Sequence, residues 1–187
     1  MKDLILVGIQ GSGKGTQARI LAEKFGYKIF ETGGVLRAMA KEKSPLGQKV
    51  KAITEAGELV PNEIVMEIVE DFLSKISSTT PIIFDGIPRS DVQRESLEKL
   101  LAGHKRKFLG LEIYLSESEA LKRLLKRAEI EGRADDTLEV IQKRIQNFYA
   151  YTKPLLEVWR NQKKLISITG EQSIEKVTEE IMEKLKD

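Results

Sequence analysis

Apolar residues follow two spacings along the chain, and stretches with the two spacings alternate. Short apolar runs of the kind found in buried strands occupy residues 4–7, 27–30, 82–85, 108–115 and 165–168. Between these runs, apolar residues recur every three or four positions, which predicts helices with one buried face. Strands separated by helices are typical of a parallel sheet that is covered on both faces. We therefore predict an α/β fold with three layers, α/β/α, around a five-stranded parallel sheet.

Start and stop signals bound the expected helices. Ser44 and Pro45 suit the N-cap and first position of one helix, and Gly26 suits the end of the first helix. Ser116, followed by Glu119 three residues later, forms a capping-box pattern. The expected helices span residues 14–25, 32–40, 45–57, 61–76, 90–101, 137–161 and 173–185, and one more begins at residue 116.

Some of these expectations depend on single residues. Phe25, Leu125 and Ile174 fall on the apolar faces of their helices, so each side chain should point into the core. Pro154 lies inside the helix expected over residues 137–161. Because proline lacks an amide hydrogen, it should kink that helix.

A glycine-rich loop, Gly8-Ile-Gln-Gly-Ser-Gly-Lys-Gly-Thr16, follows the first apolar run and precedes the first helix. A helix N-terminus has unpaired N–H groups and a partial positive charge, and glycines allow successive amides to turn toward an anion. Lys14 adds a positive charge near the outer phosphates, and the hydroxyl comes at Thr16 because Gly15 follows the lysine. Strand, loop and helix together predict the phosphate-binding loop of a P-loop NTPase-type fold.

Charged residues also gather where the other expected strands end, at the edge of a parallel sheet that binds ligands. Asp85 ends the third apolar run, where a carboxylate can hold hydrated Mg²⁺ beside phosphates. Guanidinium groups bind phosphate oxygens through two hydrogen bonds, and several of them can stabilise a phosphoryl-transfer transition state. Arg106 and Arg160 are interpreted as surface charges. The arginines that could face this edge are Arg37, Arg89, Arg123, Arg127, Arg133 and Arg144.

Composition narrows the class of protein. The 187 residues fit a single domain, and 31 Lys and Arg nearly balance 29 Asp and Glu, so the basic surface of a nucleic-acid-binding protein is not expected. With no cysteine, disulfides and cysteine zinc sites are excluded. No apolar run approaches the roughly 20 residues of a membrane span, and no secretory leader is apparent. We expect a cytoplasmic protein that binds neither nucleic acid nor membrane.

The motifs, taken in order, resemble the nucleoside monophosphate kinases, and within that family the adenylate kinases most closely. They extend over nearly the whole chain, so the resemblance is specific. The matching pieces are Gly8–Gln17, Glu31–Arg37, Gly57–Val60, Asp85–Arg89 with Gln93, Arg123 with Arg127, Arg133–Asp136 with Arg144, and Gly170.

The resemblance implies reversible phosphoryl transfer from Mg-ATP to AMP, giving two ADP, by a monomer without zinc. Residues 32–60 would form a mobile AMP-binding segment and residues 128–136 a short lid. The implied catalytic residues are Lys14, Arg89, Arg127, Arg133 and Arg144. ATP would be bound by Gly11, Ser12, Gly13, Lys14, Gly15, Thr16, Arg123, Arg127 and Gly170. AMP would be bound by Thr32, Gly33, Arg37, Val60, Gly86, Arg89, Gln93, Arg133 and Arg144, and Asp85 would hold Mg²⁺ through water.

Two positions depart from the family pattern, and two alternatives stay open. Gln10 stands where proline is usual, and Gly34 stands where an acid is usual. A kinase of CMP or UMP is one alternative, although Thr32 and Gln93 favour AMP. A nucleotide-binding regulator without catalysis is the other.

No general base is expected, because the acceptor phosphate is already ionised at pH 7. The single histidine, His104, is interpreted as a surface residue.

Overall fold

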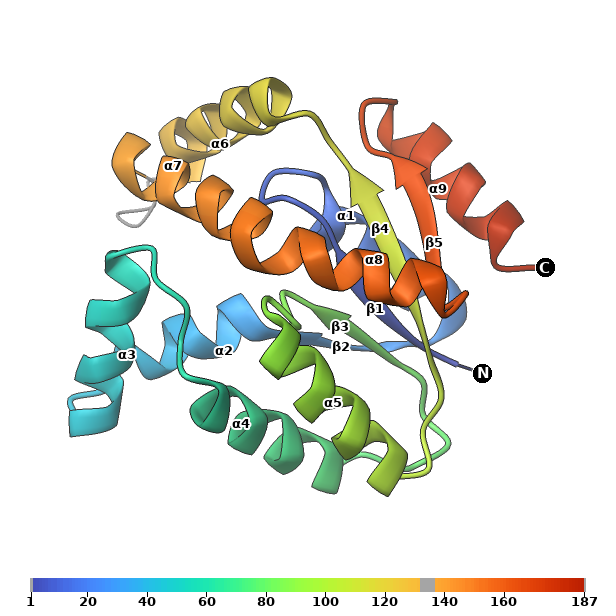
Figure 1. Cartoon of the computed structure of the whole chain (residues 1–187), viewed down its shortest axis with the longest axis horizontal. Helices are drawn as coiled ribbons and strands as arrows, with labels where there is room; N and C mark the ends of the chain where they lie inside the picture. The colour runs from blue at the N-terminus through green and yellow to red at the C-terminus, as the bar shows by residue number, and fades with distance from the viewer. Residues whose placement is uncertain (1, 132–136, 187) are drawn as a thin grey trace.

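A sheet of five parallel strands in the order β2-β3-β1-β4-β5 forms the centre of the protein. The computed structural model describes residues 2–131 and 137–186 (Figure 1). The predicted α/β fold and the parallel sheet are confirmed. The strands are β1 (Asp3–Val7), β2 (Lys28–Glu31), β3 (Ile82–Asp85), β4 (Phe108–Tyr114) and β5 (Leu165–Thr169).

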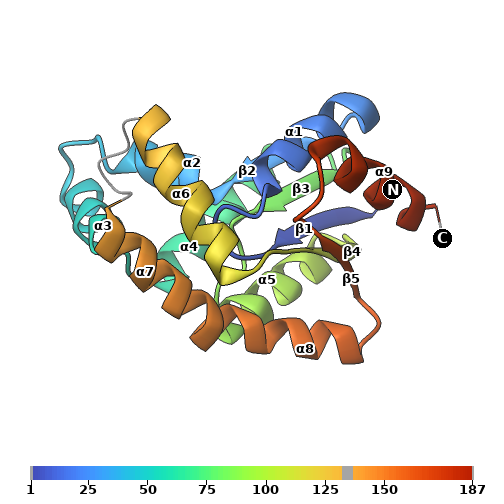
Figure 2. The ribbon, with the colours of Figure 1, turned by 90° about the horizontal axis from the view of Figure 1, so that it is seen from above.

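Alternate residues of β1 enter two different cores. Leu4 and Leu6 pack with α1 (Lys14–Phe25) and α9 (Ile174–Lys184) on one face of the sheet. Ile5 and Val7 belong to the other core. Figure 2 shows the two helical layers on opposite sides of the strands. The second layer consists of α4 (Asn62–Ser74), α5 (Asp91–Gly103) and α8 (Lys153–Asn161).

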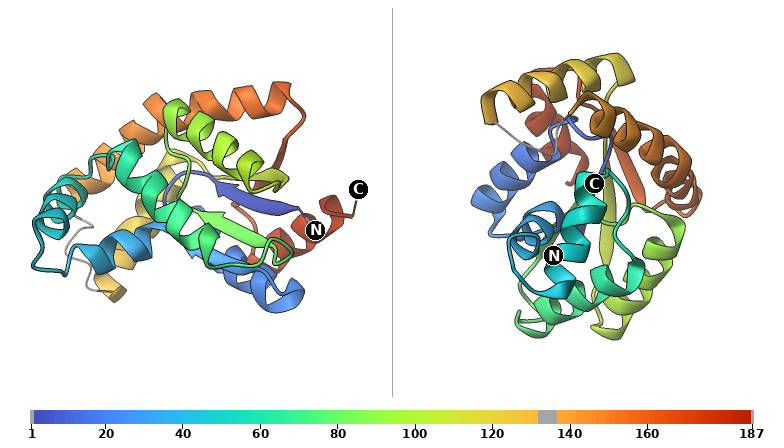
Figure 3. Two further views of the ribbon diagram at one scale, coloured as in Figure 1. Left: turned by 90° about the horizontal axis from the view of Figure 1, so that it is seen from below. Right: turned by 90° about the vertical axis from the view of Figure 1, so that its left-hand side faces the viewer.

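A third, smaller core lies under two helices beyond the sheet edge. Ile9 from the glycine loop packs there with Leu124 of α6 (Glu117–Glu131) and Ile141 of α7 (Leu138–Asn147). Two further helices, α2 (Thr32–Met39) and α3 (Pro45–Glu55), follow β2. Figure 3 shows that α3 lies at the end of the molecule opposite both termini. These elements surround the region beyond the strand ends.

The helix predicted over residues 137–161 is interrupted by a five-residue π-helical turn, Phe148–Thr152, between α7 and α8. Pro154 lies in the first turn of α8. The Lys153 N–H still bonds back to the Phe148 carbonyl oxygen, so the chain stays helical into α8, and the widened turn falls just before the residue that lacks an amide hydrogen. A kink was predicted at Pro154, and the structure has a widened turn just before the proline.

Some predicted core positions are wrong. Phe25 is 38% exposed and Ile174 is 51% exposed, whereas Gln17 is only 2% exposed. The Gln17 amide donates to the Ile174 carbonyl oxygen (3.1 Å) and accepts from the Thr178 hydroxyl (2.8 Å). Hydrogen bonds to α9 therefore bury a polar residue of α1 beside the apolar core that the two helices share.

The start of α6 also differs from the predicted capping box. The Ser116 N–H donates to Glu171 Oε1 (3.2 Å), and Glu119 Oε1 accepts from Arg123 Nε (2.9 Å). The acid that reaches the Ser116 N–H therefore comes from the loop after β5. Leu125 of the same helix is 39% exposed, contrary to the prediction that it is buried.

Arg106 is a buried ion-pair partner, not the predicted surface charge. Its Nε and Nη2 donate to the two oxygens of Asp3 at 2.7 and 2.9 Å. Nη2 also donates to the Thr80 carbonyl oxygen, and Asp3 accepts from the Ile82 N–H. The pair joins the beginnings of β1, β3 and β4. Arg160, in contrast, is partly exposed and pairs with Glu112 and Glu157.

The strand order places a crevice at the other end of the sheet. The chain moves from β1 outward to β2 and back to β3, then crosses to β4 on the opposite side of β1. Connections that leave a strand in opposite directions open a crevice at the carboxyl ends, where α/β proteins bind ligands. Within residues 2–131 and 137–186, no helix is both long and apolar enough to span a bilayer.

Candidate active site

The predicted phosphate-binding loop connects β1 to α1. Gly8 has a φ of +147°, and a Cβ there would lie 2.4 Å from the Ile113 carbonyl oxygen, so no larger residue fits. Gly13 is the N-cap of α1 with a φ of +96°. The backbone therefore passes close to β4 and then exposes the amides at the beginning of α1 to the crevice.

Lys14 is folded back onto this loop. Its Nζ donates to the Gly8 and Ile9 carbonyl oxygens at 2.7 and 2.9 Å. Burial of the ammonium group lowers the pKa of Lys14 to about 8; Asp85 opposes this shift, while Arg89 and another arginine add to it. A buried cation among other cations is poised for a polyanion, which would replace the carbonyl contacts.

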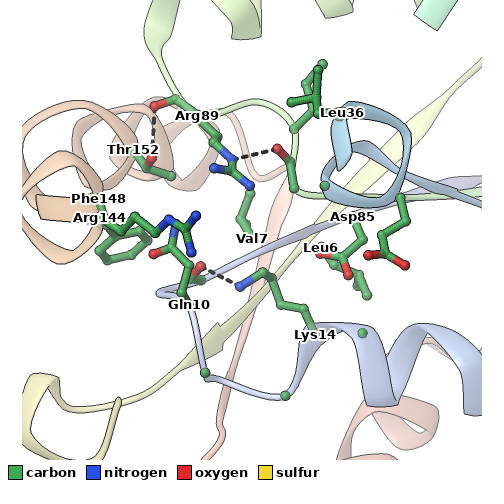
Figure 4. A pocket seen from close by; sticks show the side chains of 18 of the residues that line it. Leu6, Val7, Gln10, Lys14, Leu36, Asp85, Arg89, Arg144, Phe148 and Thr152 are labelled. Carbon is green, nitrogen blue, oxygen red and sulfur yellow. Dashed lines mark hydrogen bonds between the residues drawn. The ribbon is translucent and has the colours of Figure 1, made fainter. Parts of the chain in front are cut away.

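Arg89 is held in place by contacts along its length. Its Nε donates to the Gly86 carbonyl oxygen (2.9 Å), its N–H donates to Gln93 Oε1 (2.8 Å), and its carbonyl oxygen accepts from the Thr152 hydroxyl (2.9 Å). Burial lowers the pKa of Arg89, and Arg144 lowers it further. Its guanidinium group is therefore oriented before any ligand binds, as Figure 4 shows.

One cavity of about 390 Å³ gathers most of the predicted site. In Figure 4, Lys14 and Arg89 point into the same space, with Asp85 and Arg144 on either side. The predicted residues that line this cavity are Gly11, Gly13, Lys14, Gly15, Thr16, Gly33, Arg37, Asp85, Gly86, Arg89, Arg123, Arg127 and Arg144.

The other predicted residues within the described part of the chain do not line the cavity. Thr32 is 4% exposed, and its Oγ1 has no hydrogen-bond partner among the described residues. A Cβ on Gly86, which does line the cavity, would lie 3.5 Å from Thr32 Cβ. A buried hydroxyl without a partner is costly, and a hydrogen bond from a ligand would remove that cost. The others in this second group are Ser12, Val60, Gln93 and Gly170, all of which are buried.

Gly170 packs against the phosphate-binding loop. Its N–H donates to the Tyr114 carbonyl oxygen (2.6 Å), and a Cβ there would lie 3.0 Å from the Ser12 carbonyl oxygen. Only glycine permits this approach. The turn after β5 is therefore fixed beside the loop, although Gly170 itself does not line the cavity.

Asp85 suits a hydrated metal ion better than a directly coordinated one. The residue is 9% exposed at the end of β3, and burial raises the pKa of its carboxyl, while Lys14 opposes that shift. No cluster of three His, Cys, Asp or Glu that could hold a metal occurs in the described part of the chain. Mg²⁺ usually keeps several waters and uses one or two carboxylates with substrate phosphates, so the donor set fits that ion.

The arginines reach the cavity from several elements. Arg123 and Arg127 project from α6, Arg144 projects from α7, and Arg37 projects from α2. Arg37 Nη2 lies 2.8 Å from Glu31 Oε1. Arg133 lies outside the described residues, as does most of the predicted lid.

Several lining residues were not predicted as part of the site. They include Gln10, Arg19, Glu31, Asn147, Phe148 and Thr152. Asn147 is buried and donates from Nδ2 to the Gly57 carbonyl oxygen (3.0 Å), which joins α7 to the predicted AMP-binding segment. Arg19 lies one helical turn after Gly15, and this spacing alone could have indicated it.

Comparison with known proteins gives a consistent result. The chain matches the sequence model of the adenylate kinase family over residues 6–164. It is 40% identical to an adenylate kinase of Cyanothece sp. over 182 residues, which cover 97% of this chain and 93% of that protein. An adenylate kinase of Bacteroides thetaiotaomicron is 37% identical over 171 residues, 91% of this chain and 90% of that protein.

A third relative, an adenylate kinase of Thermus thermophilus, is 38% identical over 154 residues, which cover 82% of this chain and 80% of that protein. The family model spans the glycine loop and all the residues that line the cavity. The resemblance noted from the motifs is confirmed, and the chain belongs to the adenylate kinase family.

Proposed function

We propose that this chain catalyses the reversible transfer of the terminal phosphoryl group of Mg-ATP to AMP, which gives two ADP. The observation that carries the proposal is the convergence of Lys14 and six arginines from four helices and a loop on one cavity. Two nucleotides that meet through their phosphates bring several negative charges to one place. A cavity lined by cations neutralises that charge and aligns the reacting groups.

The chain's own residues account for catalysis without a general base. The attacking oxygen of AMP is ionised at pH 7, so no proton has to be removed from it. Lys14 would exchange its bonds to Gly8 and Ile9 for phosphate oxygens. Arg89, already oriented by its backbone contacts, would bind the AMP phosphate together with Arg37. Arg127 and Arg144 would stabilise the charge that spreads over the transferring group.

Base recognition and the metal follow from the same arrangement. The unpartnered Thr32 hydroxyl is a candidate contact for the adenine of AMP, as is Gln93, whose amide is oriented by the Arg89 N–H. Asp85 would hold the hydrated Mg²⁺ that accompanies ATP and neutralises its phosphates. We expect residues 32–60 and 128–136 to close over the substrates, and the enzyme to act as a cytoplasmic monomer.

An assay of ADP formation with Mg-ATP and a panel of AMP, CMP, UMP and GMP tests this function. AMP-dependent ADP formation that is lost in Lys14→Ala is the expected result. Equal turnover of CMP or UMP would contradict the assignment of Thr32 and Gln93. Tight ATP binding without turnover of any acceptor would contradict catalysis.

A further inference from the structure

Glu31 lines the cavity with a carboxylate, and it was not predicted as a site residue. It ends β2, and in the register of the sheet it is the direct neighbour of Asp85, which ends β3. Both carboxylates therefore leave the sheet at the same edge and line the same cavity. The charge of Glu31 also contributes to the raised pKa of Asp85, as expected for two nearby acids.

Each of these two carboxylates faces a glycine. A Cβ on Gly34 would lie 3.5 Å from the carboxylate of Glu31, and a Cβ on Gly15 would lie 3.4 Å from Asp85 Oδ2. Gly34 is the position where the family usually has an acid. In this chain the space next to that position holds the carboxylate of Glu31, which comes from three residues earlier.

Glu31 forms an exposed ion pair with Arg37, and a ligand can break this pair. Arg37 Nη2 lies 2.8 Å from Glu31 Oε1, with 40% of the Arg37 side chain and 49% of the Glu31 side chain exposed. An exposed pair of this kind adds little stability, so a phosphate dianion can attract Arg37 away from it. When AMP binds, Glu31 would be left as an unpaired carboxylate beside Asp85.

We propose that Glu31 is the second carboxylate, next to Asp85, that accepts hydrogen bonds from hydrated Mg²⁺, and that it replaces the acid absent at Gly34. The proposal rests on the proposed function. It also predicts a coupling: AMP draws Arg37 from Glu31, and the freed carboxylate strengthens Mg²⁺ binding. Such coupling is reciprocal, so Mg²⁺ should also strengthen AMP binding in the presence of ATP.

The test uses Glu31→Gln, which keeps the size of the side chain and removes its charge. Calorimetry measures binding of a bisubstrate analogue, two adenosines joined by five phosphates, with and without Mg²⁺, and the Mg²⁺ dependence of turnover is measured in parallel. Glu157→Gln is the matched control, because Glu157 pairs with Arg160 on the exposed surface of α8. Gly34→Asp, added to Glu31→Gln, returns a carboxylate to the adjacent position.

We expect Glu31→Gln to lower the Mg²⁺-dependent gain in analogue affinity about tenfold while changing Mg²⁺-free affinity less than twofold. Gly34→Asp should restore most of that loss, and Glu157→Gln should change neither quantity. An unchanged gain in Glu31→Gln, or an equal loss with and without Mg²⁺, would overturn the proposal, since an equal loss indicates a role through Arg37 alone. Failure of the proposed function would instead appear as absent turnover in the unmodified protein.

Discussion

The two ends of the sheet hold charged clusters that differ in how their charges are satisfied. At the beginning of the strands, Asp3 and Arg106 bind each other through two hydrogen bonds, and backbone groups of Thr80 and Ile82 occupy further positions. Only 3% of the Asp3 side chain and 5% of the Arg106 side chain are exposed. The charges of that cluster are therefore satisfied by groups of the protein itself.

At the carboxyl ends of the strands the balance is different. Lys14 is held by neutral carbonyl oxygens, and both Lys14 and Arg89 have lowered pKa values from burial and from neighbouring cations. The same sheet therefore carries a finished ion pair at one end and an excess of buried positive charge at the other. The ion pair stabilises the fold, while the buried cations favour the binding of an anionic ligand.

The largest expected effect comes from breaking the finished pair. Arg106→Met should lower the free energy of unfolding by about 3–5 kcal/mol, because it leaves the carboxylate of Asp3 buried without its cation. Chemical denaturation measures this loss, and the kcat of the folded fraction should stay within about twofold of the unmodified protein. Lys75→Met, which removes an exposed partner of Asp71, is the matched control and should cost less than about 1 kcal/mol. A similar loss in both variants would contradict the comparison.

The next effect concerns the other end of the sheet. Arg127→Ala should lower kcat by about 10²–10³-fold, with a smaller change in the KM for ATP, because we assign this arginine to the transition state. Steady-state kinetics with both substrates measures the change. Lys126→Ala, the exposed neighbour on α6, should leave kcat unchanged. An unaltered kcat in Arg127→Ala would remove α6 from the catalytic assignment.

The features that sequence reasoning recovered depend on residues close together in the chain. The loop from Gly8 to Thr16 and the strand that ends in Asp85 each carry their own pattern, so both were placed correctly. The missed features depend on distant partners. Asp3 and Arg106 are 103 residues apart, and Gln17 meets Thr178 across 161 residues.

Periodicity explains the remaining errors. A pattern of apolar residues counts Phe25 and Ile174 as buried, yet hydrogen bonds between α1 and α9 place Gln17 and Thr178 at the contact instead. A polar pair can be buried when each partner satisfies the other, and no local pattern marks such a pair. Glu31 was missed for a similar reason, since its position depends on the register between β2 and β3.

A smaller effect on stability is expected at the carboxyl end of the sheet, and its sign is opposite to that of Arg106→Met. Lys14→Met should raise the free energy of unfolding of the ligand-free protein by about 1–3 kcal/mol at pH 7, because it removes a buried cation whose charge the fold opposes. Turnover should be lost in the same variant. Lys24→Met, on the exposed last turn of α1, should change neither property. Destabilisation by Lys14→Met would show that its bonds to Gly8 and Ile9 outweigh burial.

The smallest expected effect is a proton taken up when ATP binds. The pKa of Lys14 is about 8 in the empty site, so half of the molecules carry a neutral lysine at that pH. Bound phosphates favour the charged form and raise this pKa, so binding at pH 8 should take up about half a proton, while at pH 7 the uptake should be small. Above pH 8, ATP affinity should fall as pH rises, because each binding event must then protonate the lysine.

Calorimetry of ATP binding in buffers of different ionisation enthalpy measures this uptake. The unmodified protein should show it at pH 8, and Lys14→Met should not, although its weaker binding requires higher protein concentrations. Lys24→Met should behave like the unmodified protein. If the uptake persisted in Lys14→Met, another group would be responsible, and the cation excess at the carboxyl end of the sheet would have to be assigned to the arginines alone.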